Sequence, residues 1–259
     1  WISRLLRWQM GYSFRLEMPI HEILAERIPY TIAVAGVTVI FTWILAIPIG
    51  IYSAVRQHSV GDYSFTFLGF IGLAVPDFLL ALVLMYIAFA YFHVSVGGLF
   101  STEYISAPWS MARLWNMMTH LWIPAIVLGT AGTAVLIRIM RNNLLDELSK
   151  PYVVTARAKG LKGWKVIVKY PVRVAINPLI SVAGYLLPYL IGGSIIVSVV
   201  LSLPTLGPVL LRALLEQDMY LAGTVVLLLG VLTIIGTLIS DILLVIVDPR
   251  IRISGGEGK

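Results

Sequence analysis

Cysteine is absent from this sequence of 259 residues. Without it the chain has no disulfide framework, no thiol nucleophile and no cysteine-ligated metal site. The four histidines are His21, His58, His93 and His120. No two of them have the spacing of ligands to one metal ion, so we expect neither a bound metal nor any other cofactor.

The common motifs of catalysis are missing as well. A phosphate-binding loop requires Gly-x-x-x-x-Gly-Lys-Ser/Thr, and the one Gly-Lys pair, Gly258-Lys259, stands at the end of the chain. Neither a Gly-x-Ser-x-Gly elbow nor a His-Glu-x-x-His helix motif occurs. We therefore expect no catalytic residues: the chain is not itself an enzyme, and any ATP hydrolysis takes place on another protein.

Charged residues are scarce. They make up 12% of the chain against 59% hydrophobic residues, and the mean hydropathy is +0.91. This leaves too little polar surface for a water-soluble globule, so the surroundings must be lipid. A net charge of +6 would suggest nucleic acid in a soluble protein. Here the cations are better explained by membrane topology, and we expect no nucleic-acid partner.

Long apolar runs are what the sequence has instead. About 20 mainly apolar residues in a helix cross the hydrocarbon core of a bilayer. Five stretches are long enough: Ile28–Val55, Tyr63–Phe92, Trp115–Ile137, Val174–Leu201 and Met219–Val247. They are far longer than the alternating segments of a membrane barrel. The sequence therefore predicts an all-α fold, a polytopic bundle of membrane helices with five spans in this chain.

The cations between the spans predict the orientation. One side receives Arg56, Arg138, Arg141, Lys150, Arg157, Lys159, Lys162, Lys165, Lys169, Arg173, Arg250, Arg252 and Lys259, which are 13 of the 19. The other side receives Arg4, Arg7, Arg15, Arg27, Arg113 and Arg212, the remaining 6. The positive-inside rule places the first group in the cytoplasm. Residues 248–259 then form a cytoplasmic tail, and residues 1–27 lie outside. We expect a further span before this segment, six in all.

The fourth apolar stretch ends in a break. Two prolines and a glycine follow within Ser202–Pro208, and they end a helix because proline lacks an N–H donor and glycine loses backbone entropy. The apolar segment Val209–Leu215 comes next. We predict a short helix there, lying on the outer side.

A polar, basic loop of about residues 139–177 joins two spans on the predicted cytoplasmic side. Pro151 and Gly160 stand where a short helix would begin and end. Tyr152, Thr155, Ala156 and Lys159 would share one face of that helix, a small-residue surface suited to a partner's groove. From the residues alone, a basic helix lying on the lipid surface explains the loop equally well.

Six short segments carry a family resemblance. They are Tyr152–Leu161 with Asn177-Pro178; Gly11–Arg15 with Arg27–Thr31; Leu203–Gly207; and Asp248–Arg252. Together they resemble the permeases of binding-protein-dependent ABC importers, and most of all the dipeptide/oligopeptide branch. The general signature is Glu-Ala-Ala, three residues, then Gly. Only Ala156 and Gly160 fit it here, but the core Ala-Arg-Ala-Lys-Gly-Leu resembles the oligopeptide branch itself.

The resemblance implies a permease domain over residues 28–247 that forms half of a translocation path. It implies a second homologous permease subunit as a heterodimer partner, two cytoplasmic ATPase subunits, and an extracellular or periplasmic solute-binding protein. The implied ATPase-coupling residues are Thr155, Ala156, Arg157, Ala158, Lys159, Gly160 and Leu161. Gly160 would let the chain turn and Ala156 would permit close packing. Arg157 and Lys159 would meet acidic groups of the ATPase or remain in water.

Three acidic residues in or beside the spans need an explanation. Asp77 follows Pro76 near the middle of the second span, where an unpaired charge is costly. It would either bond backbone groups freed at a proline kink or line the translocation path. For Asp241 and Asp248, the resemblance implies structural roles.

Two other functions remain as alternatives. A secondary transporter would build an ion relay on Asp77 and Asp241, but internal repeats and paired broken helices are not evident. An intramembrane enzyme would need a nucleophile and a base that converge in the bilayer, and the sequence offers no such pair. Within the resembled branch the substrates are mostly peptides, with oligosaccharides or nickel as alternatives. The expected location is the inner membrane of a prokaryotic cell.

Overall fold

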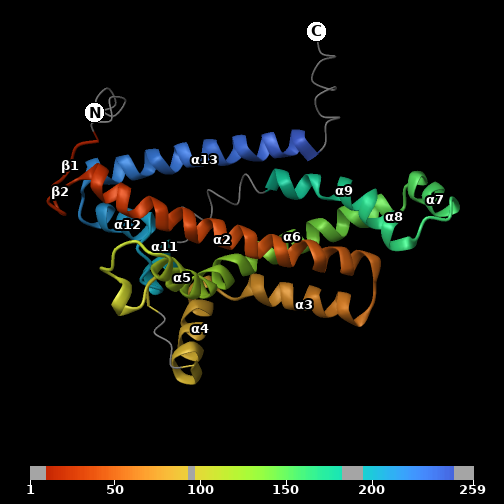
Figure 1. The fold of residues 1–259 in the computed structure, drawn as a ribbon, viewed down its shortest axis with the longest axis horizontal. Coiled ribbons are helices and arrows are strands. Elements are labelled where there is room, and N and C mark those ends of the chain that lie inside the picture. Colours follow the sequence, from red (N-terminus) through yellow and green to blue (C-terminus); the bar gives the residue numbers. More distant parts are fainter. Residues whose placement is uncertain (1–9, 93–96, 183–194, 248–259) are drawn as a thin grey trace, which may run out of the picture. The chain divides into compact units, whose positions relative to one another are not determined.

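Helices dominate the computed structural model, which describes residues 10–92, 97–182 and 195–247 (Figure 1). The elements are β1 (Tyr12–Ser13), β2 (Met18–Pro19), α2 (Ile20–Val55), α3 (Val60–Ala74), α4 (Asp77–Phe92), a 3-10 turn (Thr102–Tyr104), α5 (Met111–His120), α6 (Trp122–Leu148), α7 (Pro151–Ala158), α8 (Gly163–Lys169), α9 (Pro171–Ala175), α11 (Ile195–Val200), α12 (Leu206–Leu215) and α13 (Met219–Val247). The predicted all-α class is confirmed. In the described ranges the strands are one antiparallel pair of two residues each.

Four of the five predicted spans have counterparts. Helices α2, α6 and α13 are each long and apolar enough to cross a membrane, and α3 with α4 forms a bent pair that counts as a fourth span if the two are taken together. The remaining prediction, Val174–Leu201, includes residues 183–194, which lie outside the described part of the chain. The described ends of that stretch are helical at residues 177–182 and in α11.

Two spans are not bounded as predicted. The second span is not continuous, because the chain breaks at Val75-Pro76 before α4 begins. The third begins at Trp122 rather than Trp115, because a separate amphipathic helix, α5, precedes it. Ser110 caps α5 by accepting a hydrogen bond from the Arg113 backbone N–H at 3.2 Å. Helix α6 also continues to Leu148, so the first part of the predicted polar loop is an extension of the span.

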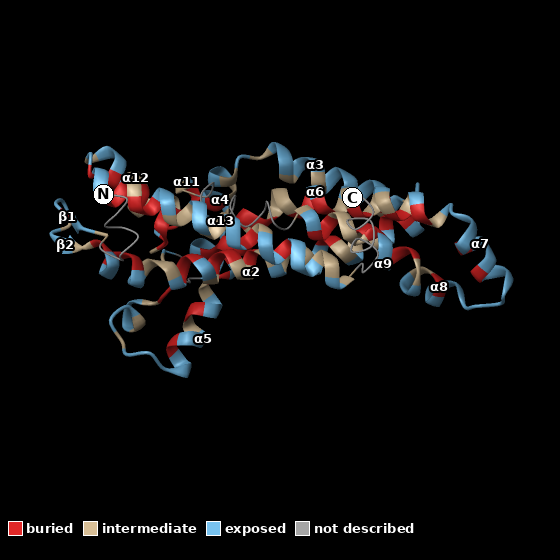
Figure 2. Ribbon diagram, turned by 90° about the horizontal axis from the view of Figure 1, so that it is seen from above, coloured by how far each residue is buried: buried red, intermediate tan, exposed pale blue. Residues whose placement is uncertain are grey.

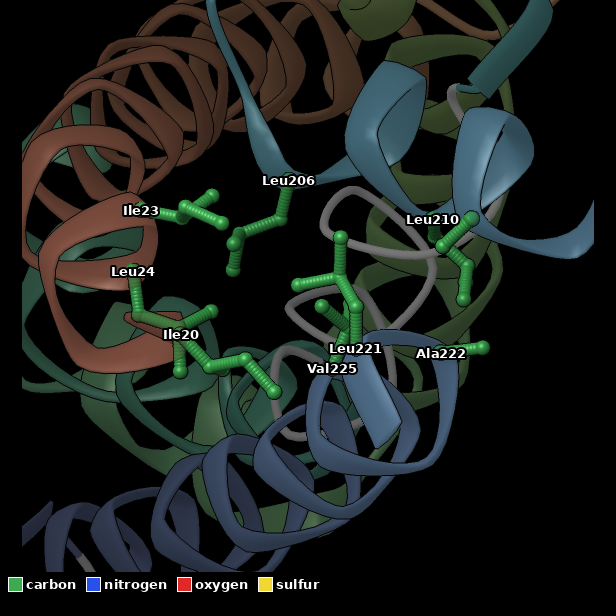
Figure 3. Close-up of a cluster of buried hydrophobic side chains, with 9 residues drawn as sticks. Ile20, Ile23, Leu24, Leu206, Leu210, Leu221, Ala222 and Val225 are labelled. Carbon is green, nitrogen blue, oxygen red and sulfur yellow. The ribbon is translucent and has the colours of Figure 1, made fainter. Parts of the chain in front are cut away.

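Contacts divide the chain into two compact units. The first comprises residues 1–38, 75–129 and 187–233. Its core joins the start of α2 to α12 and the start of α13, and Figure 3 shows these side chains converging from the three helices. Its members are Ile20, Ile23, Leu24, Leu206, Leu210, Ala213, Leu221, Ala222 and Val225. The short helix predicted after the outer break is confirmed as α12.

The second unit comprises residues 39–74, 130–186 and 234–259. Its core joins α2, α6 and α9, and its buried members are Ala46, Ala54, Leu136, Met140, Leu144, Val172, Ala175 and Leu179. Small residues bring the helices close together. A Cβ added to Gly50 of α2 would lie 2.6 Å from the Met140 Cβ of α6, closer than real atoms approach. Glycine is therefore required at this helix contact.

Large apolar side chains are exposed along several helices, as expected where lipid or a partner subunit covers them. On α13 they include Val226, Val231, Ile234, Leu238, Ile242 and Ile246. Only 11% of the apolar window of α13 is buried. A water-soluble protein does not expose so much apolar surface, so this helix requires lipid or protein around it.

Candidate functional site

The predicted short helix of the polar loop is confirmed as α7. Lys150 precedes it with extended backbone, and Pro151 occupies the first turn, where its missing N–H costs nothing. At the other end, Gly160 has a φ of +74° and its N–H donates to the Arg157 carbonyl at 2.9 Å. Side chains other than glycine rarely adopt this conformation, so Gly160 terminates the helix.

Helices α7 and α8 form a small loop domain with a core of its own. Val153 and Ala156 of α7 pack against Val166 of α8, with Tyr170 beside them. The predicted outward face is therefore corrected at Ala156: it is only 8% exposed and points inward, so it packs within the loop and not against a partner. A small residue is needed there because α8 lies across it.

The outward surface of the loop is made by the other predicted coupling residues. Figure 2 shows most of α7 and α8 as exposed. The exposed members are Thr155, Arg157, Ala158, Lys159, Gly160 and Leu161. The Thr155 hydroxyl donates to the Pro151 carbonyl of its own helix at 3.0 Å. We call these six residues the coupling face.

One carboxylate fastens the loop to the end of α6. Glu147 is buried, and its two oxygens accept from Lys150 Nζ at 2.6 Å and from the Tyr152 hydroxyl at 2.5 Å. Burial raises the pKa of the Tyr152 hydroxyl above its usual value, and the neighbouring Glu147 carboxylate raises it further. Tyr152 therefore stays protonated and continues to donate. The start of α7 is thus held to the last turn of α6.

A buried ion pair lies in the same unit and was missed by the sequence analysis. Arg141 of α6 donates from Nε and Nη2 to the two carboxylate oxygens of Asp62 in α3, both at 2.9 Å. The Asp62 side chain is 3% exposed and that of Arg141 is 23% exposed. Two parallel hydrogen bonds to a carboxylate are the strong, geometrically specific form of this contact.

The sequence held a local signal for Asp62. Ser59 and Asp62 have the Ser-x-x-Asp spacing of a capping box. In the structure the Asp62 N–H donates to Ser59 Oγ at 3.2 Å, and Asp62 Oδ2 accepts from the His58 N–H at 3.1 Å. The Asp62 carboxylate thus has two roles: it accepts a backbone hydrogen bond at the start of α3, and it binds Arg141 of α6. The sequence analysis used Arg141 only as one of the cations that predict the orientation in the membrane.

The sequence analysis placed Asp77 near the middle of one continuous span. The structure corrects this, because the helix is broken there. Asp77 stands in the first turn of α4, directly after the break at Pro76, and is partly buried. The Pro76 carbonyl accepts from the Leu79 and Leu80 N–H groups at 2.9 and 3.1 Å. A carboxylate at this position is favoured by the helix dipole, and the choice between the bracing role and the path-lining role stays a prediction.

Replacing Asp77 is expected to show which role it has. Asp77→Leu removes the favourable charge at the start of α4 and should lower the free energy of unfolding by about 1 kcal/mol. Asp77→Asn keeps a polar side chain of nearly the same size and should change this free energy by only a few tenths of a kcal/mol. Thermal unfolding of the purified protein measures both. An Asp77→Leu variant with unchanged unfolding but lost transport would instead place Asp77 in the path.

The other predicted acidic residues are placed as follows. Asp241 is exposed on α13, whereas its neighbour Ser240 is buried and donates to the Ile180 carbonyl at 2.5 Å. Asp248 and the Asp248–Arg252 segment lie outside the described residues. Among the described residues there is no cluster of three or more His, Cys, Asp or Glu that could hold a metal ion.

Three segments that carried the resemblance meet in the first unit. Ser13 Oγ donates to Asp218 Oδ2 at 2.5 Å, and Thr31 Oγ1 accepts from the Leu206 N–H at 3.0 Å. A cavity of about 260 Å³ opens beside them. Its lining includes Arg15, Arg27, Leu203, Thr205, Arg212 and Glu216. The early segments and the outer break therefore build one site, on the side that the charge count places outside.

Comparison with known proteins decides the family. Residues 46–253 match the family described as the binding-protein-dependent transport system inner membrane component. The chain belongs to this family. The oligopeptide transport system permease protein AppB of Bacillus subtilis (strain 168) is 36% identical over 254 residues, which cover 97% of this chain and 78% of the relative.

A further relative and a solved structure agree with this family assignment. The dipeptide transport system permease protein DppB of Escherichia coli (strain K12) is 30% identical over 268 residues, covering 97% of this chain and 79% of the relative. Among solved structures, the inward-facing MetNI methionine ABC transporter matches with a TM-score of 0.68 at 17% identity, over 89% of this chain and 98% of that one. That likeness confirms the fold.

Proposed function

We propose that the chain is the membrane-spanning permease subunit of an ATP-driven importer and forms half of a translocation path for peptides. The α7–α8 loop is the observation that carries this proposal. It is a separate element between spans, has its own core, exposes a coupling face and is held to α6 by Glu147. The relatives named as oligopeptide and dipeptide permeases support peptides as the substrate.

The mechanism follows from how the loop is attached. The coupling face binds an ATPase subunit on the cytoplasmic side, so a movement of that subunit displaces α7. Glu147 transmits the displacement to α6, because its hydrogen bonds to Lys150 and Tyr152 tie the two helices. The α6 residues Met140 and Leu144 pack in the core with α2 and α9, so these helices move with it.

The proposed assembly has four further subunits. Two ATPase subunits bind the coupling faces, and a second homologous permease subunit completes the path as a heterodimer partner. A solute-binding protein delivers peptide from the opposite side, where the cavity lined by Arg15, Arg27 and Arg212 offers a surface for its contact. Membrane lipid surrounds the permeases, and ATP is hydrolysed on the ATPase subunits.

Reconstitution of the whole transporter tests the function. The complex, placed in vesicles with its binding protein, should accumulate a labelled peptide only when ATP is supplied to the cytoplasmic face of the complex. Unlabelled peptides should compete, whereas nickel or an oligosaccharide should not. Uptake driven by an ion gradient without ATP would favour the secondary transporter and contradict the proposal.

The proposed orientation puts the C-terminus and the α7–α8 loop in the cytoplasm of a prokaryotic cell. Because the chain contains no cysteine, single introduced cysteines report on topology without background. A cysteine at exposed Lys162 should react with an impermeant reagent only after cell lysis. Cysteines at Glu103 or Glu216 should react on intact cells. The reverse labelling pattern would invert the orientation.

A further inference from the structure

A second cavity, of about 240 Å³, lies between α3 and α6 in the second unit. Its lining is Asp62, Tyr63, Phe65, Thr66, Gly69, Phe70, Ala134, Ile137, Arg138, Arg141 and Asn142. Gly69 and Ala134 bring the two helices close together here, since a Cβ on Gly69 would lie 3.5 Å from the Ala134 Cβ. The wall is partly aromatic and apolar, and its two cationic side chains, Arg138 and Arg141, both come from α6. We call this cavity the inner groove.

The polar groups of the inner groove leave one positive charge unmatched. Asp62 and Arg141 neutralise each other through their bidentate pair. Arg138 is exposed, and none of the described residues forms an ion pair with it. Its guanidinium lies 5.8 Å from the centre of the Phe70 ring, a distance typical of a cation–π contact. Asn142 follows one turn later on the same face of α6 and is also exposed.

The apolar surface continues from the groove along α3. Phe67 is 64% exposed, Phe70 58% and Ile71 43%. In the proposed orientation this end of α3 and α6 lies at the cytoplasmic boundary of the membrane. The lipids of that leaflet include anionic ones, which basic pockets between membrane helices bind by their headgroups. Anionic phospholipids combine the two chemistries that the groove presents, a negative phosphate and an acyl chain.

We propose that the inner groove binds one anionic phospholipid. The phosphate accepts hydrogen bonds from the Arg138 guanidinium and the Asn142 amide, and an acyl chain lies along Phe67, Phe70 and Ile71 of α3. The charges match, since one phosphodiester balances the one unpaired arginine. The proposal rests on the proposed orientation, which cysteine labelling tests separately.

Lipid retention by the purified transporter tests this site. The complex is incubated with phosphatidylglycerol or with phosphatidylcholine, and retained lipid is counted by native mass spectrometry. The wild type should retain phosphatidylglycerol preferentially. Arg138→Gln should retain about fivefold less of it, the effect expected for the loss of one arginine near an anionic headgroup. Arg138→Lys, which keeps the charge, should retain most of it.

A matched control separates a site from general attraction between cations and lipid. Arg173 is also an exposed arginine, placed within α9 next to the start of the predicted span Val174–Leu201, but it does not line the groove. Arg173→Gln should retain phosphatidylglycerol as the wild type does. Equal losses in both arginine variants, or no loss in Arg138→Gln, would overturn the proposal.

Two further measurements distinguish a bound lipid from the other candidate occupants, a free anion and a protein subunit. Inorganic phosphate should displace little of the bound lipid, because it lacks the acyl chain; complete displacement would show an anion site without a lipid. A cysteine at Thr66, in the groove wall, should not form a crosslink to the second permease subunit in the assembled transporter. An efficient crosslink would show that protein fills the groove and would overturn the proposal.

Discussion

Replacing Ala156 with tryptophan is expected to lower peptide transport and peptide-stimulated ATP hydrolysis by more than about tenfold, while membrane insertion is unchanged. Ala156 is buried against Val166, so an indole ring cannot be accommodated without forcing α7 and α8 apart. Overpacking of this kind costs about 1 to 3 kcal/mol, enough to displace the coupling face. Transport and hydrolysis are measured in vesicles that contain the complete transporter.

Val168→Trp is the control for this variant. Val168 lies on the same small loop domain, but it is 54% exposed, so the larger side chain extends into solvent. It should leave transport close to that of the wild type. Normal transport by Ala156→Trp would mean that the packing of α7 on α8 does not matter for coupling.

Removing the guanidinium of Arg141 is expected to have the largest effect on stability. Arg141→Ala leaves the Asp62 carboxylate buried without its partner, and such a change costs about 3 kcal/mol or more. The double variant Asp62→Asn, Arg141→Gln removes both charges and should recover more than half of the loss. Thermal unfolding of the purified protein measures the stability of each variant.

An exposed ion pair in the same chain serves as the comparison. Arg212 and Glu216 also form a contact of 2.8 Å, but their side chains are 60% and 33% exposed. Arg212→Ala should therefore change the free energy of unfolding by less than about 1 kcal/mol. Equal effects of Arg141→Ala and Arg212→Ala would show that burial of the Asp62 pair contributes nothing.

Features determined by local chemistry were predictable from the sequence. Apolar runs located α2, α6 and α13, because lipid demands about 20 apolar residues from any spanning helix. Pro151 and Gly160 bounded α7 correctly, since each acts on the backbone next to it. The resemblance in residues 152–161 also pointed to the family that the comparisons confirm.

Features that depend on distant contacts were not predictable. Pro76 signalled a kink, but whether the chain bends slightly or starts a new helix depends on the packing around it. Asp62 and Arg141 are 79 residues apart, so their pairing is decided by the way α3 and α6 come together. The inward direction of Ala156 likewise follows from α8, which begins only after the turn at Gly160.

The separate core of the α7–α8 loop has a consequence for how importers of this kind diversify. Val153, Ala156 and Val166 form this core with Tyr170 beside them, and they are distinct from the exposed positions that we propose bind an ATPase subunit. Substitutions on the coupling face, apart from Gly160 with its φ of +74°, therefore leave the shape of the loop intact. If these positions bind the ATPase as we propose, a permease that acquires a different ATPase after gene duplication needs changes on the surface of the loop and not in its core.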